Sequence, residues 1–293
     1  MTENTADAYR RKFRAVLEHI DAHLDQDLTL DRLSAVAAVS KYHFHRQFSL
    51  LFGIAVHKYV QLVRSKRASY QLAFRSGRII EVALSNGYES HEAFSRAFKK
   101  ITGQTPSEFR EQPEWEPWHA THQPLSELRS LHMKPEYRPE DVKIVLFPET
   151  RVATLQHRGD PARIEATIAS FIAWRQQNRL PPHASATFNL LYNDPVETPP
   201  EEFRLDLCAA TPRAVAENPF GVVEGTIPAG RCALLRHQGS DDTLAETLRY
   251  LYTRWLPASG EEPRDFPLFV QRIRFFPDVP EQEAISDVFL PLK

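Results

Sequence analysis

Proline is distributed very unevenly along this chain of 293 residues, and its placement limits where long helices can form. Of the 22 prolines, Pro106 alone precedes Pro113. A proline inside a helix removes a backbone hydrogen bond and clashes with the preceding turn. The first part of the chain can therefore be entirely helical, whereas the remainder is expected to combine strands, loops and helices.

Charge changes at the same place as proline content. Residues 1–110 carry 17 Lys and Arg against 11 Asp and Glu, which gives +6, whereas residues 111–293 carry 19 against 27, which gives −8. This division indicates two domains, of which the first is basic enough to favour phosphate contacts.

The chain contains no apolar run of about 18 residues and no signal-peptide pattern, so we expect a cytoplasmic protein with no membrane partner. Cys208 and Cys232 are too few for a disulfide framework and are not spaced as a zinc site. His43 and His45 stand at i and i+2, which points them away from each other on a helix. We expect neither a metal nor a cofactor.

The first domain has the apolar spacing of amphipathic helices, from Tyr9 to Leu24 and from Val56 to Phe74. Between them, Thr29 is placed to cap a second helix, and a third is expected between a Ser40 cap and Gly53. Phe44 and Phe48 are expected in the core. The opposite face of the third helix carries groups suited to reading base edges, namely Tyr42, His45, Arg46 and Ser49.

The domain also repeats its own sequence pattern. Ser40 corresponds to Ser90, and Arg46 to Arg96; Phe44, Phe48 and Gly53 recur with the same offset. The second copy reads as a helix, a turn at Gly87 and another helix, the unit that places its second helix in a major groove. The helix expected between the copies spans roughly 28 Å, close to the ~34 Å between successive major grooves on one face of DNA.

Two segments, LTLDRLSAVAAVSKYHFHRQFSLLFG and IIEVALSNGYESHEAFSRAFKKITGQTPSEFR, resemble the DNA-binding domain of the AraC/XylS family. The resemblance implies a transcription regulator, typically an activator, that binds double-stranded DNA and contacts RNA polymerase. It also implies that base-reading residues lie on the two repeated helices. By position these are Tyr42, His45 and Arg46 on the first, and His91, Glu92, Ser95 and Arg96 on the second; Ser49 and Lys99 complete the predicted set. Glu92 has an alternative role as a helix cap.

The sequence predicts an all-α double helix-turn-helix domain over 1–111, a pair of homeodomain-like units joined by a linker helix. Residues 112–139 are proline-rich and without clear periodicity, so we interpret them as an interdomain linker. His119 and His122 are expected in solvent there. A second domain is expected over 140–293.

The second domain contains its own repeat. The pattern from Pro148 to Gly159 recurs from Pro228 to Gly239, and its alternating apolar positions predict a strand in each copy. Helices are expected over 163–177 and 243–255, and further strands over 186–192, 204–209, 267–274 and 284–290. Two such pseudo-symmetric strand-helix-strand repeats predict an α+β domain with helices on one face of the sheet and a cleft on the other.

The segments LYNDPVETPPEEFRLDLC, TIPAGRCALLRHQGS and LYTRWLPASG resemble the GyrI-like effector-binding domain, and the whole chain resembles Rob-like regulators. The resemblance implies a cleft for a small hydrophobic effector, with a glutamate that pairs with cationic ligands. Val270 stands where that glutamate is expected, which favours a neutral or anionic ligand; Glu224 is an alternative carboxylate. The candidate effector-binding residues are Trp174, Tyr192, Trp255, Phe269 and Arg272.

These features predict a sequence-specific regulator that reads two successive major grooves and responds to a small molecule. Two alternatives for the second domain are a protein-interaction module and a small-molecule hydrolase. No nucleophile and base stand at a recognisable catalytic spacing, and both cysteines lie in expected strands. We therefore name no catalytic residue and expect no enzymatic activity.

Overall fold

The computed structural model describes residues 5–293, which form two compact units. Of the described residues, 5–134 and Phe276–Gln282 form the first unit, and Pro135–Phe275 and Glu283–Lys293 form the second. No described helix is long and apolar enough to cross a membrane.

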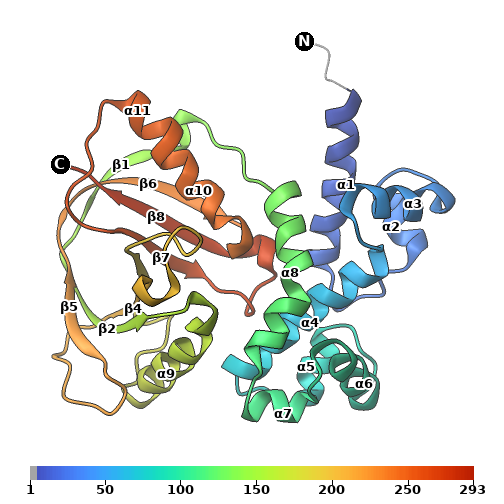
Figure 1. The fold of residues 1–293 in the computed structure, drawn as a ribbon, viewed down its shortest axis with the longest axis horizontal. Coiled ribbons are helices and arrows are strands. Elements are labelled where there is room, and N and C mark those ends of the chain that lie inside the picture. Colours follow the sequence, from blue (N-terminus) through green and yellow to red (C-terminus); the bar gives the residue numbers. More distant parts are fainter. Residues whose placement is uncertain (1–4) are drawn as a thin grey trace. The chain divides into compact units, whose positions relative to one another are not determined.

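The first unit is built from helices, as predicted. In chain order its described α-helices are α1 (Thr5–Ala22), α2 (Leu30–Val36), α3 (Lys41–Phe52), α4 (Val56–Phe74), α5 (Ile79–Ser85), α6 (His91–Thr102), α7 (Pro106–Glu111) and α8 (Trp115–His132). Figure 1 shows α4 between two helix pairs, α2 with α3 and α5 with α6. The structure therefore confirms the two helix-turn-helix units and the bounds of the connecting helix.

Local sequence signals fix the ends of the repeated helices. The Ser90 hydroxyl accepts a hydrogen bond from the Ala93 backbone N–H at 3.1 Å, as an N-cap does. Ser40 occupies the equivalent position without a side-chain cap bond. Gly53 and Gly103 end α3 and α6 in the left-handed conformation, at φ 72° and 84°, which glycine adopts without steric cost.

Each pair of helices packs through phenylalanines on the inner side of its second helix, α3 or α6. Phe44 and Phe48 belong to a core with α1, the first part of α4 and Leu125 of α8. Phe94 and Phe98 belong to a second core with the later part of α4, α5 and Trp118. The long connecting helix α4 thus contributes to both cores and joins the two helix-turn-helix units within the first compact unit.

The predicted linker is wrong for residues 115–132, which form helix α8. Trp118 is buried, and its indole Nε1–H donates to the Ser69 hydroxyl of α4 at 2.8 Å. His122 is buried as well and stacks on Trp118 with 4.1 Å between ring centroids, contrary to the expectation that it lies in solvent. The helix tolerates Pro117 because an early proline forgoes an N–H that has no helical partner. Pro124 lies inside the helix on an exposed face.

The second unit contains strands β1 (Lys143–Phe147), β2 (Thr150–Arg158), β3 (Thr187–Leu191), β4 (Arg204–Ala210), β5 (Val223–Ile227), β6 (Gly230–Gln238), β7 (Leu268–Arg274) and β8 (Ile285–Pro291). Its helices are α9 (Ile164–Gln177), α10 (Leu244–Tyr250) and α11 (Leu256–Ser259), with a π-helical turn at Leu251–Trp255 between the last two. The strands and helices predicted for both repeats are present.

The two repeats interlock in one antiparallel sheet of eight strands. The order β1-β6-β8-β7-β3-β4-β2-β5 is symmetric about the β7–β3 pair, because β5 to β8 repeat β1 to β4. Each repeat also places its first strand on the edge of the other, with β1 beside β6 and β5 beside β2. Figure 1 shows the resulting sheet as strongly curved.

The two faces of this sheet have different neighbours. Trp174 and Phe171 of α9 pack on Leu155, while Trp255 packs with Leu235. The helices therefore lie on one face, as predicted. The opposite face, where a cleft was expected, holds a packed cluster whose aromatic rings are Phe147, Phe188, Phe269 and Phe289.

The repeated histidines join each strand to its helix. The ring of His157 lies 2.8 Å from the Thr167 hydroxyl and 3.1 Å from the Asp160 carbonyl. His237 makes the same contacts in the second copy, with Thr247 at 2.7 Å and the Ser240 carbonyl at 3.1 Å. A carbonyl only accepts, so Nε2 carries the proton and Nδ1 accepts from the threonine. The histidine of the motif is thus structural.

Candidate DNA and effector sites

The outer face of α3 carries three exposed residues of the predicted set. Tyr42, His45 and Arg46 are all exposed, and Tyr42 is 82% accessible. Ser49 lies on the same side but is half-buried. A phenol, an imidazole and a guanidinium side by side offer hydrogen bonding and stacking to base edges.

The equivalent face of α6 carries more charge. His91, Arg96 and Lys99 are exposed, whereas Ser95 is half-buried and its hydroxyl has no accessible surface. Lys99 stands where the first helix-turn-helix unit has the neutral Ser49, and Glu92 adds an exposed negative charge to the same face. These two added charges offset each other.

Glu92 acts as a cap in the protein alone, in agreement with the alternative role considered for it. Its backbone N–H and the Ser90 hydroxyl hydrogen-bond to its carboxylate, and these bonds lower the pKa of Glu92 below its ordinary value. The carboxylate is exposed. It must exchange these local bonds for a base contact if it reads DNA.

Basic residues of α4 mostly hold the domain together. Arg64 donates to the Leu24 carbonyl at 3.0 Å and to the Gln26 carbonyl at 2.7 Å. Lys66 is buried and lies 2.9 Å from a Glu281 carboxylate oxygen. Lys58 remains exposed at the start of the helix, so it is the α4 lysine available to a phosphate.

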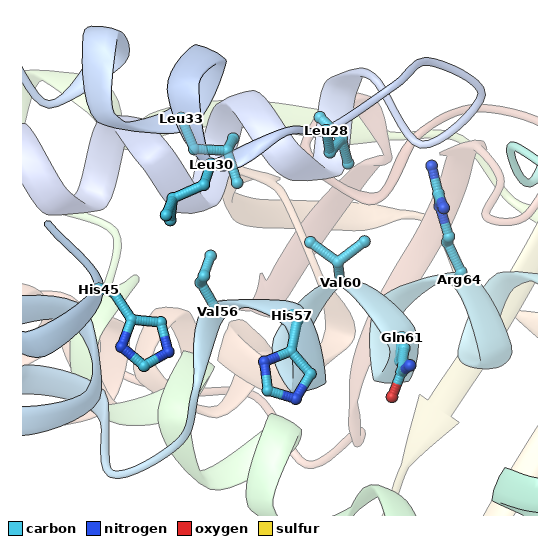
Figure 2. Close-up of a pocket in the computed structure, with 9 residues that line it drawn as sticks. All are labelled: Leu28, Leu30, Leu33, His45, Val56, His57, Val60, Gln61 and Arg64. Atoms are coloured by element: carbon cyan, nitrogen blue, oxygen red, sulfur yellow. The ribbon is translucent and has the colours of Figure 1, made fainter. Parts of the chain in front are cut away.

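A hollow lies beside the first reading helix, between α2 and α4. Figure 2 shows Val56 and Val60 of α4 pointing toward Leu30 and Leu33, with His45 and His57 at the side. Its volume is about 380 Å³ and its lining is mainly apolar. His45 is one of the residues predicted to read DNA, so an occupant of this hollow would also touch the face of α3 that carries the predicted set.

The structure separates the five candidate effector residues into groups. Trp174 and Trp255 are buried on the helix-covered face in different clusters. Phe269 is fully buried on the opposite face, stacked on Phe289 with 4.9 Å between centroids. Tyr192 donates to the Asp206 carboxylate at 3.0 Å.

Arg272 lies close to the position where a glutamate was expected. Val270, which is fully buried, pairs in register with Asn189, and the Arg272 Nε donates to the Asn189 side-chain oxygen at 2.8 Å. The same guanidinium lies 2.5 Å from the exposed carboxylate of Asp241. An anionic ligand would compete with Asp241 for the Arg272 guanidinium, which the bond to Asn189 holds in place.

Cys208, Cys232 and Glu224, the other residues considered for a chemical role, lie in environments that indicate a structural role. Burial raises the pKa of the Cys208 thiol to about 12, which keeps it protonated and unreactive at neutral pH. Burial also raises the pKa of Cys232. Glu224, the alternative carboxylate, lies on edge strand β5 and faces Arg151 at 3.5 Å. The described residues contain no group of three or more His, Cys, Asp or Glu side chains that would hold a metal ion.

Comparison with known protein families identifies both units. The model of the GyrI-like small molecule binding domain matches residues 140–293, and a helix-turn-helix domain model matches residues 33–112. The chain belongs to the GyrI-like family. With its AraC-type helix-turn-helix region, this GyrI-like protein is a DNA-binding transcription regulator.

Curated relatives of this GyrI-like protein match one unit each. The probable transcriptional regulator YgiV of Escherichia coli K12 is 38% identical over 153 residues, which cover 52% of this chain and 96% of the relative. The right origin-binding protein of the same strain is 37% identical over 102 residues, which cover 35% of either chain. The crystal structure of the EcmrR C-terminal domain is 16% identical, with a TM-score of 0.43, and covers 52% of this chain and 96% of that one.

Proposed function

We propose that this regulator reads two successive major grooves with α3 and α6 and that a small molecule bound by the C-terminal domain modulates it. The observation that carries the DNA part is the pair of equivalent faces on these helices, Tyr42, His45 and Arg46 on one and His91 and Arg96 on the other. Helix α4 contributes to the core of each unit, so the spacing of the faces is set by one element.

A binding-site selection with the purified protein tests sequence-specific reading. Arg46→Ala and Arg96→Ala are each expected to weaken binding to the selected operator by ~1–3 kcal/mol and to relax base preference at separate positions. Arg78→Ala is a matched control, because Arg78 is an exposed arginine of the same domain and pairs with Glu81 at 2.7 Å. If all three variants bind the operator as wild type does, the assignment of the reading helices is incorrect.

The effector part of the proposal rests on Arg272 and its exposed partner Asp241. We expect neutral or anionic apolar molecules to stabilise the protein in a thermal-shift screen, and Arg272→Gln to weaken the response to anionic ones. Trp174 and Trp255 frame the helix-covered side of the same domain. A domain that captures only proteins, or that turns over an activated ester, would contradict this part alone.

The AraC-type resemblance extends the proposal to transcription itself. We expect the DNA-bound regulator to contact RNA polymerase and to activate from its operator. Transcription in vitro from the selected site, with and without the protein, measures the direction of regulation. Lower transcript levels with the bound protein would identify a repressor.

A further inference from the structure

One segment of the C-terminal half of the chain is part of the DNA-binding unit. Phe276–Gln282 lies between β7 and β8 in the chain, yet it belongs to the same compact unit as residues 5–134. We call this segment the hairpin loop. Figure 1 shows it in red beside α8.

The hairpin loop contributes a carboxylate to a buried group of charges. Glu281 lies 2.9 Å from the Lys66 ammonium of α4 and also pairs with Arg129 of α8. Arg129 in turn lies 2.8 Å from Asp21 of α1, whose carboxylate accepts a hydrogen bond from Tyr59. We call Asp21, Lys66, Arg129 and Glu281 the four-charge cluster. Their side chains are at most 8% exposed, and the two positive and two negative charges balance.

A second anchor holds the other end of the loop on the same helix. Asp278 accepts two hydrogen bonds from the Arg75 guanidinium, at 2.6 and 2.8 Å, just past the end of α4. Phe276, which precedes both anchors in the chain, places its ring 5.3 Å from that of Tyr70. The loop therefore contacts α4 at Lys66 and Tyr70 and contacts Arg75 just past its end.

The hairpin loop therefore contacts α4, the helix that sets the spacing of the two reading helices. Removing the Glu281 charge would leave Lys66 and Arg129 with an unbalanced positive charge in a buried place, which is costly to a fold. Lys66 lies between the part of α4 that packs in the first core, residues 56–63, and the part that packs in the second core, Ala68 and Leu72. Without the loop α4 would bend at this point, so the two reading faces would lose their fixed spacing while each core keeps its own structure.

We propose that the hairpin loop is the element through which the C-terminal domain controls DNA reading. β7 carries Arg272 and runs directly into the loop, so a change in that strand acts on a segment seated on α4. The inference rests on the proposed function and adds its route of regulation. When the hairpin loop is bound to α4, the spacing of α3 and α6 is fixed. When the loop leaves α4, that spacing becomes variable.

Three variants of the full-length protein test this inference on the selected operator. Glu281→Gln is expected to weaken operator binding by about tenfold, comparable to one mismatched base pair. Asp278→Asn should have a smaller effect, because the Asp278 side chain is 53% exposed and exposed ion pairs contribute little. Glu283→Gln is the matched control: it removes an ion pair with Arg274, at 2.7 Å, close by in the chain but outside the DNA-binding unit.

Two further measurements separate this role from simple loss of stability. An operator lengthened by two base pairs between its halves should bind wild type about tenfold more weakly, whereas Glu281→Gln should discriminate much less between the two lengths. Hydrogen exchange should become faster in the loop and α4 of this variant while α3 and α6 stay protected. If Glu281→Gln unfolds, Asp278→Asn provides the same comparison.

The outcomes distinguish the inference from the proposal beneath it. If wild type shows no sequence preference, the proposed function fails. If wild type reads its operator and both Glu281→Gln and Asp278→Asn retain its affinity and length discrimination, the loop has no control over DNA reading and the inference is overturned.

Discussion

Ala38 adopts a conformation that the equivalent turn assigns to a glycine. Its φ is 52°, in the left-handed region, directly after the C-cap of α2, and Gly87 has φ 73° at the same place after α5. A Cβ in this region costs roughly 1 kcal/mol. We therefore expect Ala38→Gly to raise the free energy of unfolding by up to about 1 kcal/mol, measured by urea denaturation.

The reverse substitution in the second turn is expected to destabilise. A Cβ on Gly87 would lie 2.4 Å from the Leu24 carbonyl oxygen and 2.3 Å from the Arg64 guanidinium. The backbone oxygen cannot move aside easily, so Gly87→Ala should cost more than the ~1 kcal/mol expected of the conformation alone. Gly53→Ala serves as the control, since its φ of 72° is similar but no atom lies within 4 Å of the added Cβ. Equal losses in the two variants would contradict the steric argument.

His122 gives the protein a pH-dependent stability. Burial lowers its pKa from 6.5 to about 4, and its Nδ1–H donates to the Trp118 carbonyl. Below pH 6.5 the unfolded chain binds a proton at His122 that the folded chain does not accept until about pH 4, so stability falls as pH decreases through this window. Between pH 7 and pH 5 this residue should remove about 2 kcal/mol from the free energy of unfolding.

The comparison that isolates His122 uses urea denaturation at both pH values. His122→Phe should lose about 2 kcal/mol less than wild type on the change from pH 7 to pH 5. The exposed His91→Gln should behave as wild type. An unchanged pH response in His122→Phe would show that another group carries it.

At the level of elements, α8 is a structural part of the DNA-binding unit. Trp118→Phe removes the hydrogen bond to the buried Ser69 hydroxyl and leaves a smaller ring, so we expect a loss of about 1–3 kcal/mol. Trp115→Phe is a suitable control, because Trp115 makes ring contacts on a half-buried site. Thermal unfolding of both variants compares them, and equal midpoints would mean that the Ser69 contact contributes nothing.

Helix α8 also shows why sequence reasoning was incomplete. The helices from α1 to α6 follow from apolar spacing, caps and the repeat of the first domain, all of which are visible in the sequence. In α8, Pro117 and Pro124 argue against a helix when the sequence alone is considered. The helix is stabilised by tertiary contacts of Trp118 and Leu125. Tertiary packing overrides propensity in such a segment.

The edge strands β1 and β5 of the second unit lie outside the strands predicted from its sequence. The repeat of this domain therefore gave no indication that each repeat adds a strand to the edge of the other. β1 pairs with β6 and β5 with β2, so the partners come from different repeats and lie far apart in the chain. The sequence also did not show which candidate effector residues lie together. Phe269 and Val270 are neighbours in sequence but point to opposite faces of the sheet, because side chains alternate along a strand.

At the scale of the whole molecule, the exposed face of α3 was predictable from the sequence and the buried charge balance was not. Helical spacing and repetition place Tyr42 and Arg46 on that face, and their reading of DNA stays a prediction. The four-charge cluster joins Asp21 to Glu281 across most of the chain, and no local pattern relates these residues. Lys66 looks like one more basic residue of a DNA-binding helix until its buried partner is known.

If α3 and α6 both read DNA, as proposed, their arrangement on one connecting helix predicts how a single chain occupies its operator. Helix α4 has 19 residues, so its length is about 28 Å, and its two ends belong to separate cores. A distance of this size suits successive major grooves on one face of the duplex, which are ~34 Å apart. One chain should therefore fill one operator, and mass photometry of the complex measures that stoichiometry directly.

Operator length supplies the decisive check on this geometry. Inserting five base pairs between the two halves turns one groove to the opposite side of the duplex, since a turn contains about 10.5 base pairs. A rigid helix cannot follow that rotation, so only one of the two helices can engage its half, and binding should fall to the level of an operator in which one half is scrambled. Scrambling one half while keeping the spacing is the control, and should leave the contacts of the other half intact. Undiminished binding to the lengthened operator would show that α3 and α6 engage DNA independently, or that two chains share the site.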